Sequence, residues 1–298
     1  MSRLSQSIQT LKAELALLLA AFIWGFAFVA QREGMAFIGP LAFNAIRFAF
    51  GALSLIPIAL ITRAGLPATN GKTLLIGGGV TGVILFIAAS LQQIGVVYTT
   101  AGKAGFITGL YVILVPLMGL AVRQRVGRWT WLGAVCALIG LYCLTVTEAF
   151  TIAPGDLWVM AGAFFWAVHV HLIAQFAPRV GALRLALIQF AICSVLSFGA
   201  AFAFEPMRPS EVVNAALPIL YAGVLSVGVA YTLQVVGQTD APPAQAAIIL
   251  SLETVFAVWG GWLLLGETLP PRGLLGCALM FAGMIVAQLD PRSPPAQH

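Results

Sequence analysis

The amino-acid sequence predicts an all-α membrane protein with ten transmembrane helices, built as two five-helix repeats of inverted topology with both termini in the cytoplasm. Three observations lead to this prediction: the composition, the spacing of the apolar runs and an internal repeat. Of the 298 residues, 60% are hydrophobic and 8% are charged, and the mean hydropathy is +0.99. A water-soluble domain usually has about one quarter charged residues. Lipid is therefore expected to be the main solvent of this chain.

Ten apolar runs divide the chain, and each is bounded by charged residues, proline or glycine. A helix needs about 20 mostly apolar residues to cross a hydrocarbon core of roughly 30 Å. The predicted spans cover residues 13–31, 40–61, 73–95, 101–122, 129–147, 156–176, 183–203, 213–237, 243–265 and 272–288. The connections are short, so no separate soluble domain is expected, and the polar segments 1–12 and 289–298 are predicted to be cytoplasmic tails.

The positive charge does not indicate a nucleic-acid partner. The net charge is +5 and the isoelectric point is near 9.3, but Lys and Arg lie singly or in small groups without a basic stripe. The cysteines all lie inside apolar runs and show neither a CxxC pair nor the spacing of metal ligands: Cys136, Cys143, Cys193 and Cys277. They are predicted to be packing residues, so no disulfide, metal or cofactor is expected.

The distribution of positive charge predicts the orientation, because cytoplasmic loops of membrane proteins carry an excess of Lys and Arg. With the N-terminus inside, the cytoplasmic side holds ten basic residues: Arg3, Lys12, Arg63, Lys72, Arg123, Arg125, Arg128, Arg179, Arg184 and Arg292. The outer side holds three: Arg32, Arg208 and Arg272. Two more, Arg47 and Lys103, lie within predicted helices. Both termini are therefore predicted to be cytoplasmic.

An internal repeat emerges when the sequence is shifted by 142 residues. The matched pairs include Phe22 with Phe164, Trp24 with Trp166, Phe48 with Phe190, Gln92 with Gln234, Gly95 with Gly237 and Gly119 with Gly261. One further residue of shift aligns Leu132, Gly133 and Gly140 with Leu275, Gly276 and Gly283. Matches of Ala, Leu and Gly are frequent by chance in this composition, but Trp and Gln matches in one register across four helices indicate a duplication.

The duplication predicts two units, residues 13–147 and 156–288, with five helices each. Because five is an odd number, the second unit must enter the membrane from the opposite face. Two such halves can rock about a site near the membrane midplane and expose it to one side at a time. Four glycines spaced by two helical turns are predicted to be packing surfaces between helices: Gly133, Gly140, Gly276 and Gly283.

The segment SLETVFAVWGGWLLLGETLPPRGLLGCALMFAGMIVA, Ser251–Ala287, resembles the EamA-like family of the drug/metabolite transporter superfamily. The resemblance rests on a Leu-Glu pair in the ninth predicted helix, a Gly-Glu pair at its end, a short turn with proline and a Gly-x6-Gly pattern in the tenth helix. The first half has looser counterparts in Lys103–Leu117 and Phe22–Val29. Two features depart from the family pattern: Thr254 stands where proline is frequent, and Arg125 stands opposite Glu267.

The resemblance implies a ten-helix carrier of the cell inner (plasma) membrane. Many members of the family export amino acids or other small metabolites. The resemblance also implies that helices 1 to 4 and 6 to 9 enclose a central cavity, while helices 5 and 10 lie at the periphery.

Two ionisable residues lie deep in predicted helices. Glu253 is about nine residues into its helix, or roughly 13 Å at 1.5 Å per residue. An ionisable group at such depth usually faces a cavity or a partner. Glu253 could bind and release a coupling proton, or it could be a protonated or paired carboxyl that fixes helix packing. Arg47 cannot become neutral by losing its proton. It could bind a substrate carboxylate, snorkel, or pair within the protein, with Glu253 as one partner, whereas Lys103 is expected to snorkel.

Further candidates for a substrate site are aromatic or neutral polar. Trp24 and Trp166 occupy equivalent, deep positions and could form the two walls of a cavity or could be core packing. His169 lies three residues after Trp166 on the same helical face and is a better candidate than His171. The polar residues Asn44, Gln92, Tyr111 and Gln234 could bind a substrate, with Thr108 and Tyr231 as further groups, but helix-to-helix hydrogen bonds can use such side chains equally well.

These features favour a secondary transporter, most of all an exporter of small metabolites such as amino acids, which works by alternating access. The sequence has no GxxxxGK[ST] motif for a nucleotide, and it has no HExxH motif, no GxSxG motif and no second deep carboxylate that would indicate an enzyme. The expected partners are a small-molecule substrate, the lipid bilayer and protons if Glu253 couples transport, and the expected state is a monomer or a homodimer. A membrane sensor or assembly scaffold without transport remains the alternative.

Overall fold

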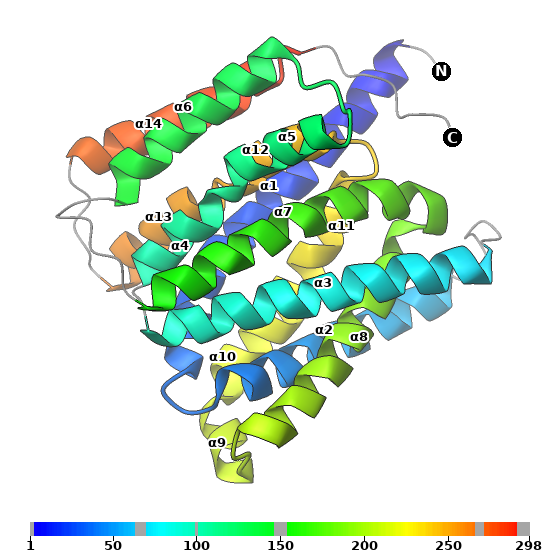
Figure 1. The fold of residues 1–298 in the computed structure, drawn as a ribbon, viewed down its shortest axis with the longest axis vertical. Coiled ribbons are helices and arrows are strands. Elements are labelled where there is room, and N and C mark those ends of the chain that lie inside the picture. Colours follow the sequence, from blue (N-terminus) through cyan, green and yellow to red (C-terminus); the bar gives the residue numbers. More distant parts are fainter. Residues whose placement is uncertain (1–2, 63–69, 99–100, 146–153, 266–270, 291–298) are drawn as a thin grey trace.

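The computed structural model describes residues 3–62, 70–98, 101–145, 154–265 and 271–290. These residues form a bundle of helices without a strand in the described ranges (Figure 1). The first half contains α1 (Arg3–Gly34), α2 (Pro40–Thr62), α3 (Gly71–Tyr98), α4 (Ala101–Gly109), α5 (Tyr111–Ala121) and α6 (Arg128–Thr145). The second half contains α7 (Pro154–Val180), α8 (Ala182–Phe204), α9 (Pro209–Asn214), α10 (Ala216–Leu220), the π-helix η2 (Tyr221–Tyr231), α11 (Thr232–Gly237), α12 (Pro243–Leu250), α13 (Glu253–Leu265) and α14 (Pro271–Ala287).

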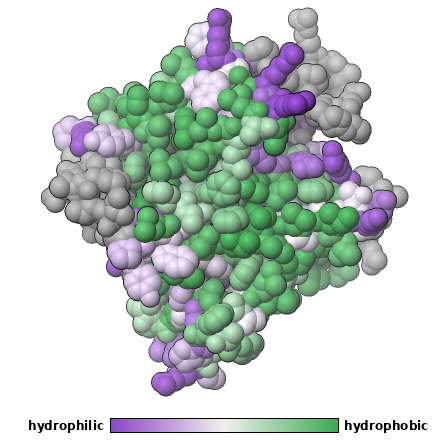
Figure 2. Space-filling model, in the orientation of Figure 1, coloured by the Kyte–Doolittle hydropathy of each residue, from purple (hydrophilic) through white to green (hydrophobic). Residues whose placement is uncertain are grey.

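Eight helical stretches of the described chain are long and apolar enough to cross a membrane. They are Gln9–Gly34, Pro40–Ile61, Gly71–Tyr98, Ala104–Ala121, Pro154–Val180, Ala182–Phe204, Ala216–Gly237 and Pro243–Gly260. The two other predicted spans correspond to shorter apolar helices, Arg128–Cys143 and Pro271–Ala287. The visible face is largely hydrophobic, with its most hydrophilic residues near the margins (Figure 2). The chain is therefore a multi-pass membrane protein.

The predicted tail at residues 1–12 is helical from Arg3 onward, because α1 extends beyond the apolar run. The start of α1 and the end of α14 lie at the same end of the bundle (Figure 1). An even number of crossings produces this arrangement.

Two predicted spans are each interrupted by a tight turn. At the junction of α4 and α5, the N–H of Leu110 donates to the carbonyl of Ile107. At the junction of α12 and α13, the N–H of Leu252 donates in the same way to the carbonyl of Ile249. Such three-residue bonds tighten the helix locally and often mark hinges. The two turns lie at equivalent positions in the 142-residue register.

The helices of one half pack mainly on helices of the other half. The closest neighbours are α6 with α14, α3 with α7, and α2 with α8. Figure 1 shows α6 and α14 side by side at one edge of the bundle. The four glycines predicted as packing surfaces lie in this contact: a Cβ on Gly133 would lie 2.5 Å from the carbonyl oxygen of Gly283, and one on Gly140 would lie 2.6 Å from that of Gly276. The prediction is confirmed.

Two carboxylates cap helices of the other half. Glu205, just after α8, accepts hydrogen bonds from the backbone N–H groups of Leu41 and Ala42 at 2.8 Å each. Asp290, in the segment predicted as a polar tail, accepts one from the N–H of Thr130 at 2.6 Å. The carboxylates thereby satisfy free donors at the starts of α2 and α6.

Candidate functional site

A cavity lies between the two halves. Its lining residues come from α1, α3, α4, α5, α7, η2, α11, α12 and α13: Trp24, Phe28, Gln31, Gln92, Thr108, Tyr111, Trp166, Val170, Ser226, Tyr231, Gln234, Leu250 and Glu253. The space open to the centre of a water molecule is about 40 Å³. A water molecule needs about 10–15 Å³ on that measure, so the cavity has room for a few waters.

Most of the lining residues form pairs in the 142-residue register. Five pairs contribute: Trp24 with Trp166, Phe28 with Val170, Gln92 with Gln234, Thr108 with Leu250, and Tyr111 with Glu253. Both members of each pair reach the same space although they are far apart in sequence. The cavity is therefore centred where equivalent elements of the two halves meet.

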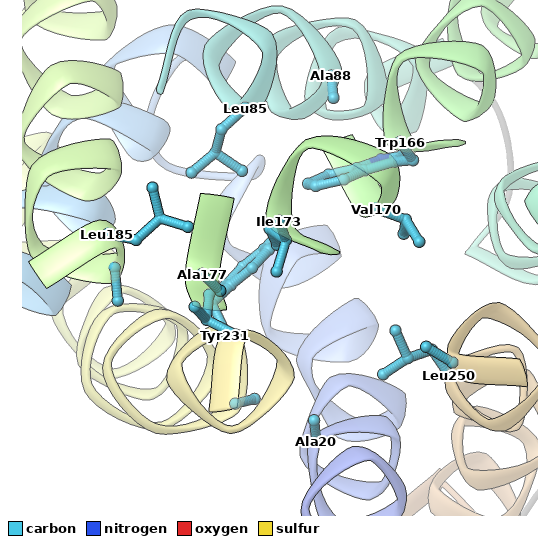
Figure 3. Close-up of a cluster of buried hydrophobic side chains, with 14 of the residues drawn as sticks. Ala20, Leu85, Ala88, Trp166, Val170, Ile173, Ala177, Leu185, Tyr231 and Leu250 are labelled. Carbon is cyan, nitrogen blue, oxygen red and sulfur yellow. The ribbon is translucent and has the colours of Figure 1, made fainter. Parts of the chain in front are cut away.

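Three aromatic rings form the apolar wall. Tyr231 lies between the two tryptophans, with ring centroids 4.6 Å from Trp24 and 5.9 Å from Trp166. Figure 3 shows Tyr231 extending from its helix into the middle of the buried cluster, near Ile173. Trp24 Nε1 donates to the carbonyl of Ser226 at 3.2 Å, inside η2. The π-helix thus presents a carbonyl oxygen that a side chain from α1 can use.

The two equivalent glutamines are used differently. Gln92 Oε1 accepts from Trp166 Nε1 at 2.7 Å and from Thr108 Oγ1 at 3.5 Å, and Gln92 Nε2 donates to Gln31 Oε1 at 3.4 Å. By contrast, Gln234 Oε1 is buried and has no hydrogen-bond partner among the described residues. The side chain of Gln92 therefore holds neighbouring residues of the cavity wall in place, whereas the side-chain oxygen of Gln234 is free to accept a hydrogen bond.

Glu253 and Tyr111 meet across the cavity. Both are 5% exposed, and their side chains are within hydrogen-bonding reach of each other. Each is the first residue after the tight turn in its span. Thr254, which stands at the family's frequent proline position, donates to the carbonyl of Gly105 at 3.5 Å. The turn therefore places the one carboxyl group of the lining opposite a hydroxyl.

Six of the nine predicted site residues line the cavity: Trp24, Gln92, Tyr111, Trp166, Gln234 and Glu253. The other three, Asn44, Arg47 and His169, are not part of the lining. His169 Nε2 lies 2.9 Å from Gln189 Oε1, and both side-chain polar atoms of Asn44 are buried without a partner in the described chain.

Arg47 does not pair with Glu253 in the part of the chain that the structure describes. Its guanidinium lies over the rings of Phe43 and Phe48, at 5.6 and 5.0 Å. Tyr231 lies within electrostatic range of both charged residues. His171 Nε2 is 2.9 Å from the carbonyl of Val115. The Lys103 side chain and Glu267 lie outside the described residues.

The sequence reasoning ranked Tyr231 below other polar residues, although its ring is central to the site. It also missed Phe28, Gln31, Val170, Ser226 and Leu250. The repeat register contained a signal that could have paired two of the site residues, because it makes Tyr111 the counterpart of Glu253.

Among the described residues, no group of three His, Cys, Asp or Glu side chains could hold a metal ion.

Comparisons with known proteins agree with this architecture. The EamA-like transporter family model matches residues 11–146 and again residues 153–288. An uncharacterized transporter of Archaeoglobus fulgidus is 30% identical over 287 residues, covering 96% of this chain and 88% of the relative. A Salmonella typhimurium protein named "Probable amino-acid metabolite efflux pump" is 25% identical, covering 90% and 92% of the two chains.

A solved crystal structure has the same fold. It superposes with a TM-score of 0.76 at 21% identity, and the match covers 97% of this chain and 98% of that chain. The two family matches together span nearly the whole sequence. The chain therefore belongs to the EamA-like transporter family of the drug/metabolite transporter superfamily.

Proposed function

We propose that this chain is a secondary exporter of small metabolites such as amino acids, which works by alternating access in the cell inner membrane. The observation that carries the proposal is the cavity lined by equivalent residues of both halves. Exchange of conformation between two similar halves would open this cavity to one side and then to the other. The small cavity suits a closed state between those two openings.

The proposed topology has ten spans, both termini in the cytoplasm and two inverted units at residues 13–147 and 156–288. The excess of Lys and Arg on the inner side supports it. The two shorter apolar helices, α6 and α14, would be the fifth and tenth spans. The tight turns at Leu110 and Leu252 would be the hinges about which each half bends.

The cavity residues have distinct proposed roles. Trp24 and Trp166 would bind the apolar part of a substrate between them, while Gln92 and Gln234 would orient its polar groups. Glu253 would exchange a proton with the substrate pathway, and the Tyr111 hydroxyl would donate to its carboxylate form. Of the three candidates outside the lining, His169 would position this wall from behind, whereas Asn44 and Arg47 have no role in it.

The test is substrate flux in proteoliposomes across a panel of amino acids, with and without a pH gradient. We expect Glu253→Gln to lose its response to the gradient, with gradient-driven flux falling about tenfold or more. Glu211→Gln changes a half-buried carboxylate in α9 outside the cavity lining and serves as the control, because its flux should equal that of the wild type.

Two outcomes would change the proposal. Equal, gradient-independent flux in the wild type and in Glu253→Gln would make the protein a uniporter with a structural glutamate. A folded wild-type protein that moves no compound in the panel would favour a membrane sensor or assembly scaffold. The proposed monomer or homodimer can be distinguished by the mass of the purified protein in detergent.

A further inference from the structure

A buried cation lies behind the cavity and is not explained by the roles above. Arg47 is 1% exposed, and its Nε has no hydrogen-bond partner among the described residues. Its electrostatic neighbours there are Tyr231 and Cys193, and no carboxylate is among them. A guanidinium cannot shed its proton. A charged side chain within a membrane helix is costly unless a partner neutralises it, so an anion is expected to bind there.

Two further unused donors belong to α2 and to the neighbouring α8. Asn44 is one helical turn away on the same face of α2, and its Nδ2 has no partner in the described chain. Gln189, on the neighbouring α8, is the counterpart of Arg47 in the repeat, and its Nε2 is also without a partner there. Ser194 donates to the carbonyl of Ala45 at 2.8 Å, which holds this part of α8 against α2. Three N–H groups that lack acceptors are thus available to an anion.

Tyr231, a residue of the cavity lining, lies within electrostatic range of Arg47. Tyr231 lines the cavity, and its ring centroid lies 5.9 Å from that of Phe48, over which the guanidinium of Arg47 is placed. Tyr231 ends the π-helix, and its backbone lies where π-geometry returns to α-geometry. Contact between a cavity occupant and Arg47 would require at least this side chain to move.

We propose that Arg47, with Asn44 and Gln189, binds the carboxylate of the transported metabolite. The proposal rests on the proposed function and narrows its substrates to metabolites that carry a carboxylate. A zwitterion would fit both charges, because Glu253 in the cavity lining can receive an ammonium group. Arg47 would then recognise one end of the substrate while Glu253 recognises the other.

The test measures binding rather than transport, by quenching of tryptophan fluorescence in the purified protein. The probes are L-phenylalanine and L-phenylalaninamide, which differ only at the carboxyl group. We expect the wild type to prefer the acid about 10- to 100-fold, as for a hydrogen-bonded charge pair. In Arg47→Gln the preference should disappear. This variant installs the residue that already occupies the equivalent position in α8, and Arg208→Gln, at an exposed arginine, is the matched control.

The proposal is overturned if the wild type binds acid and amide equally, or if Arg47→Gln keeps the preference. It is also overturned if replacing chloride by gluconate destabilises only the wild type while the acid adds nothing, because the bound anion is then inorganic. If Arg47→Gln does not fold, Arg47→Lys is measured instead. A reduced preference for the acid supports the proposal, because lysine lacks the planar guanidinium that binds a carboxylate through two hydrogen bonds. An unchanged preference contradicts the proposal. Acid-selective binding without flux would refute the transport function alone.

Discussion

Helix α3 in the first half and the segment α10–η2–α11 in the second half are counterparts with different backbones. α3 is regular from Gly71 to Tyr98, whereas the second-half segment adopts π-geometry over Tyr221–Tyr231. Both bring a glutamine to the cavity, but Gln92 is held by three side chains and Gln234 keeps a free acceptor. The regular member of the pair is therefore the more rigid wall, and the irregular member carries the central Tyr231.

The two halves also differ at the positions of the buried charged residues. Glu253 faces the cavity where the first half has Tyr111, and Arg47 lies behind it where the second half has Gln189. The glycines of α6 and α14, by contrast, are used reciprocally. The difference teaches that the duplicated glycines maintain packing and the duplicated Trp and Gln residues line the cavity, while the charged groups lie at positions where the duplicates have diverged.

The largest expected effect tests the shared packing. Gly283→Ala would place a Cβ 2.6 Å from the carbonyl oxygen of Gly133, so α6 and α14 would have to separate. We expect a loss of about 3 kcal/mol in the free energy of unfolding, at the upper end for overpacking. Gly199→Ala in α8 is the control, because its Cβ would meet nothing within 4 Å. Denaturation in detergent by added SDS measures both, and equal stabilities would refute the reciprocal contact.

An intermediate effect tests the unequal glutamines. Gln92→Leu leaves the donors of Trp166 and Thr108 without their acceptor, and we expect it to cost about 2 kcal/mol of stability. Gln234→Leu should leave the stability within about 0.5 kcal/mol of wild type, because it removes no acceptor in use, while weakening ligand binding. The same SDS titration, paired with fluorescence binding, checks both. If the two variants lose equal stability, Gln92 and Gln234 contribute equally to the fold, and the difference in their hydrogen bonds has no energetic consequence.

The smallest expected effect concerns the caps that join the halves. Glu205→Ala removes the acceptor of two N–H groups at the start of α2, and we expect a loss of about 1 kcal/mol. Glu33→Ala, at an exposed position in α1, is the control and should be neutral. A thermal melt in detergent can resolve the difference. No shift for Glu205→Ala would mean that water replaces the carboxylate without loss.

Much of the fold was predictable because apolar run length reports directly on a membrane span. The structure has long apolar helices in eight of the predicted spans. The packing glycines were also predictable, since their spacing places them on one helical face. The π-helix was not, because residues 213–237 have no pattern that distinguishes π-turns from α-turns.

The site was predictable only in part. Hydropathy and sequence position indicate how deep a residue lies, but they do not indicate which neighbouring helix it faces. Arg47 and Asn44 are deep, yet neither belongs to the cavity lining, and Arg47 lies within electrostatic range of Cys193 in α8. Trp24, Trp166, Gln92 and Gln234 were found because each had a counterpart that confirmed the position. Tyr231 had none, since Ala89 occupies the equivalent place.

The packing of each half on the other has a consequence for biosynthesis. When α6 has just been inserted, α2, α3 and α6 have not yet met α8, α7 and α14, their main neighbours in the finished protein. At about 5–20 residues per second, translation of the second half takes on the order of ten seconds. During that time Gln92 has no Trp166 to bind, and the glycine face of α6 is open to lipid. The first half is therefore an incomplete intermediate in the bilayer until the second half has been made, and its packing surfaces are exposed during that time.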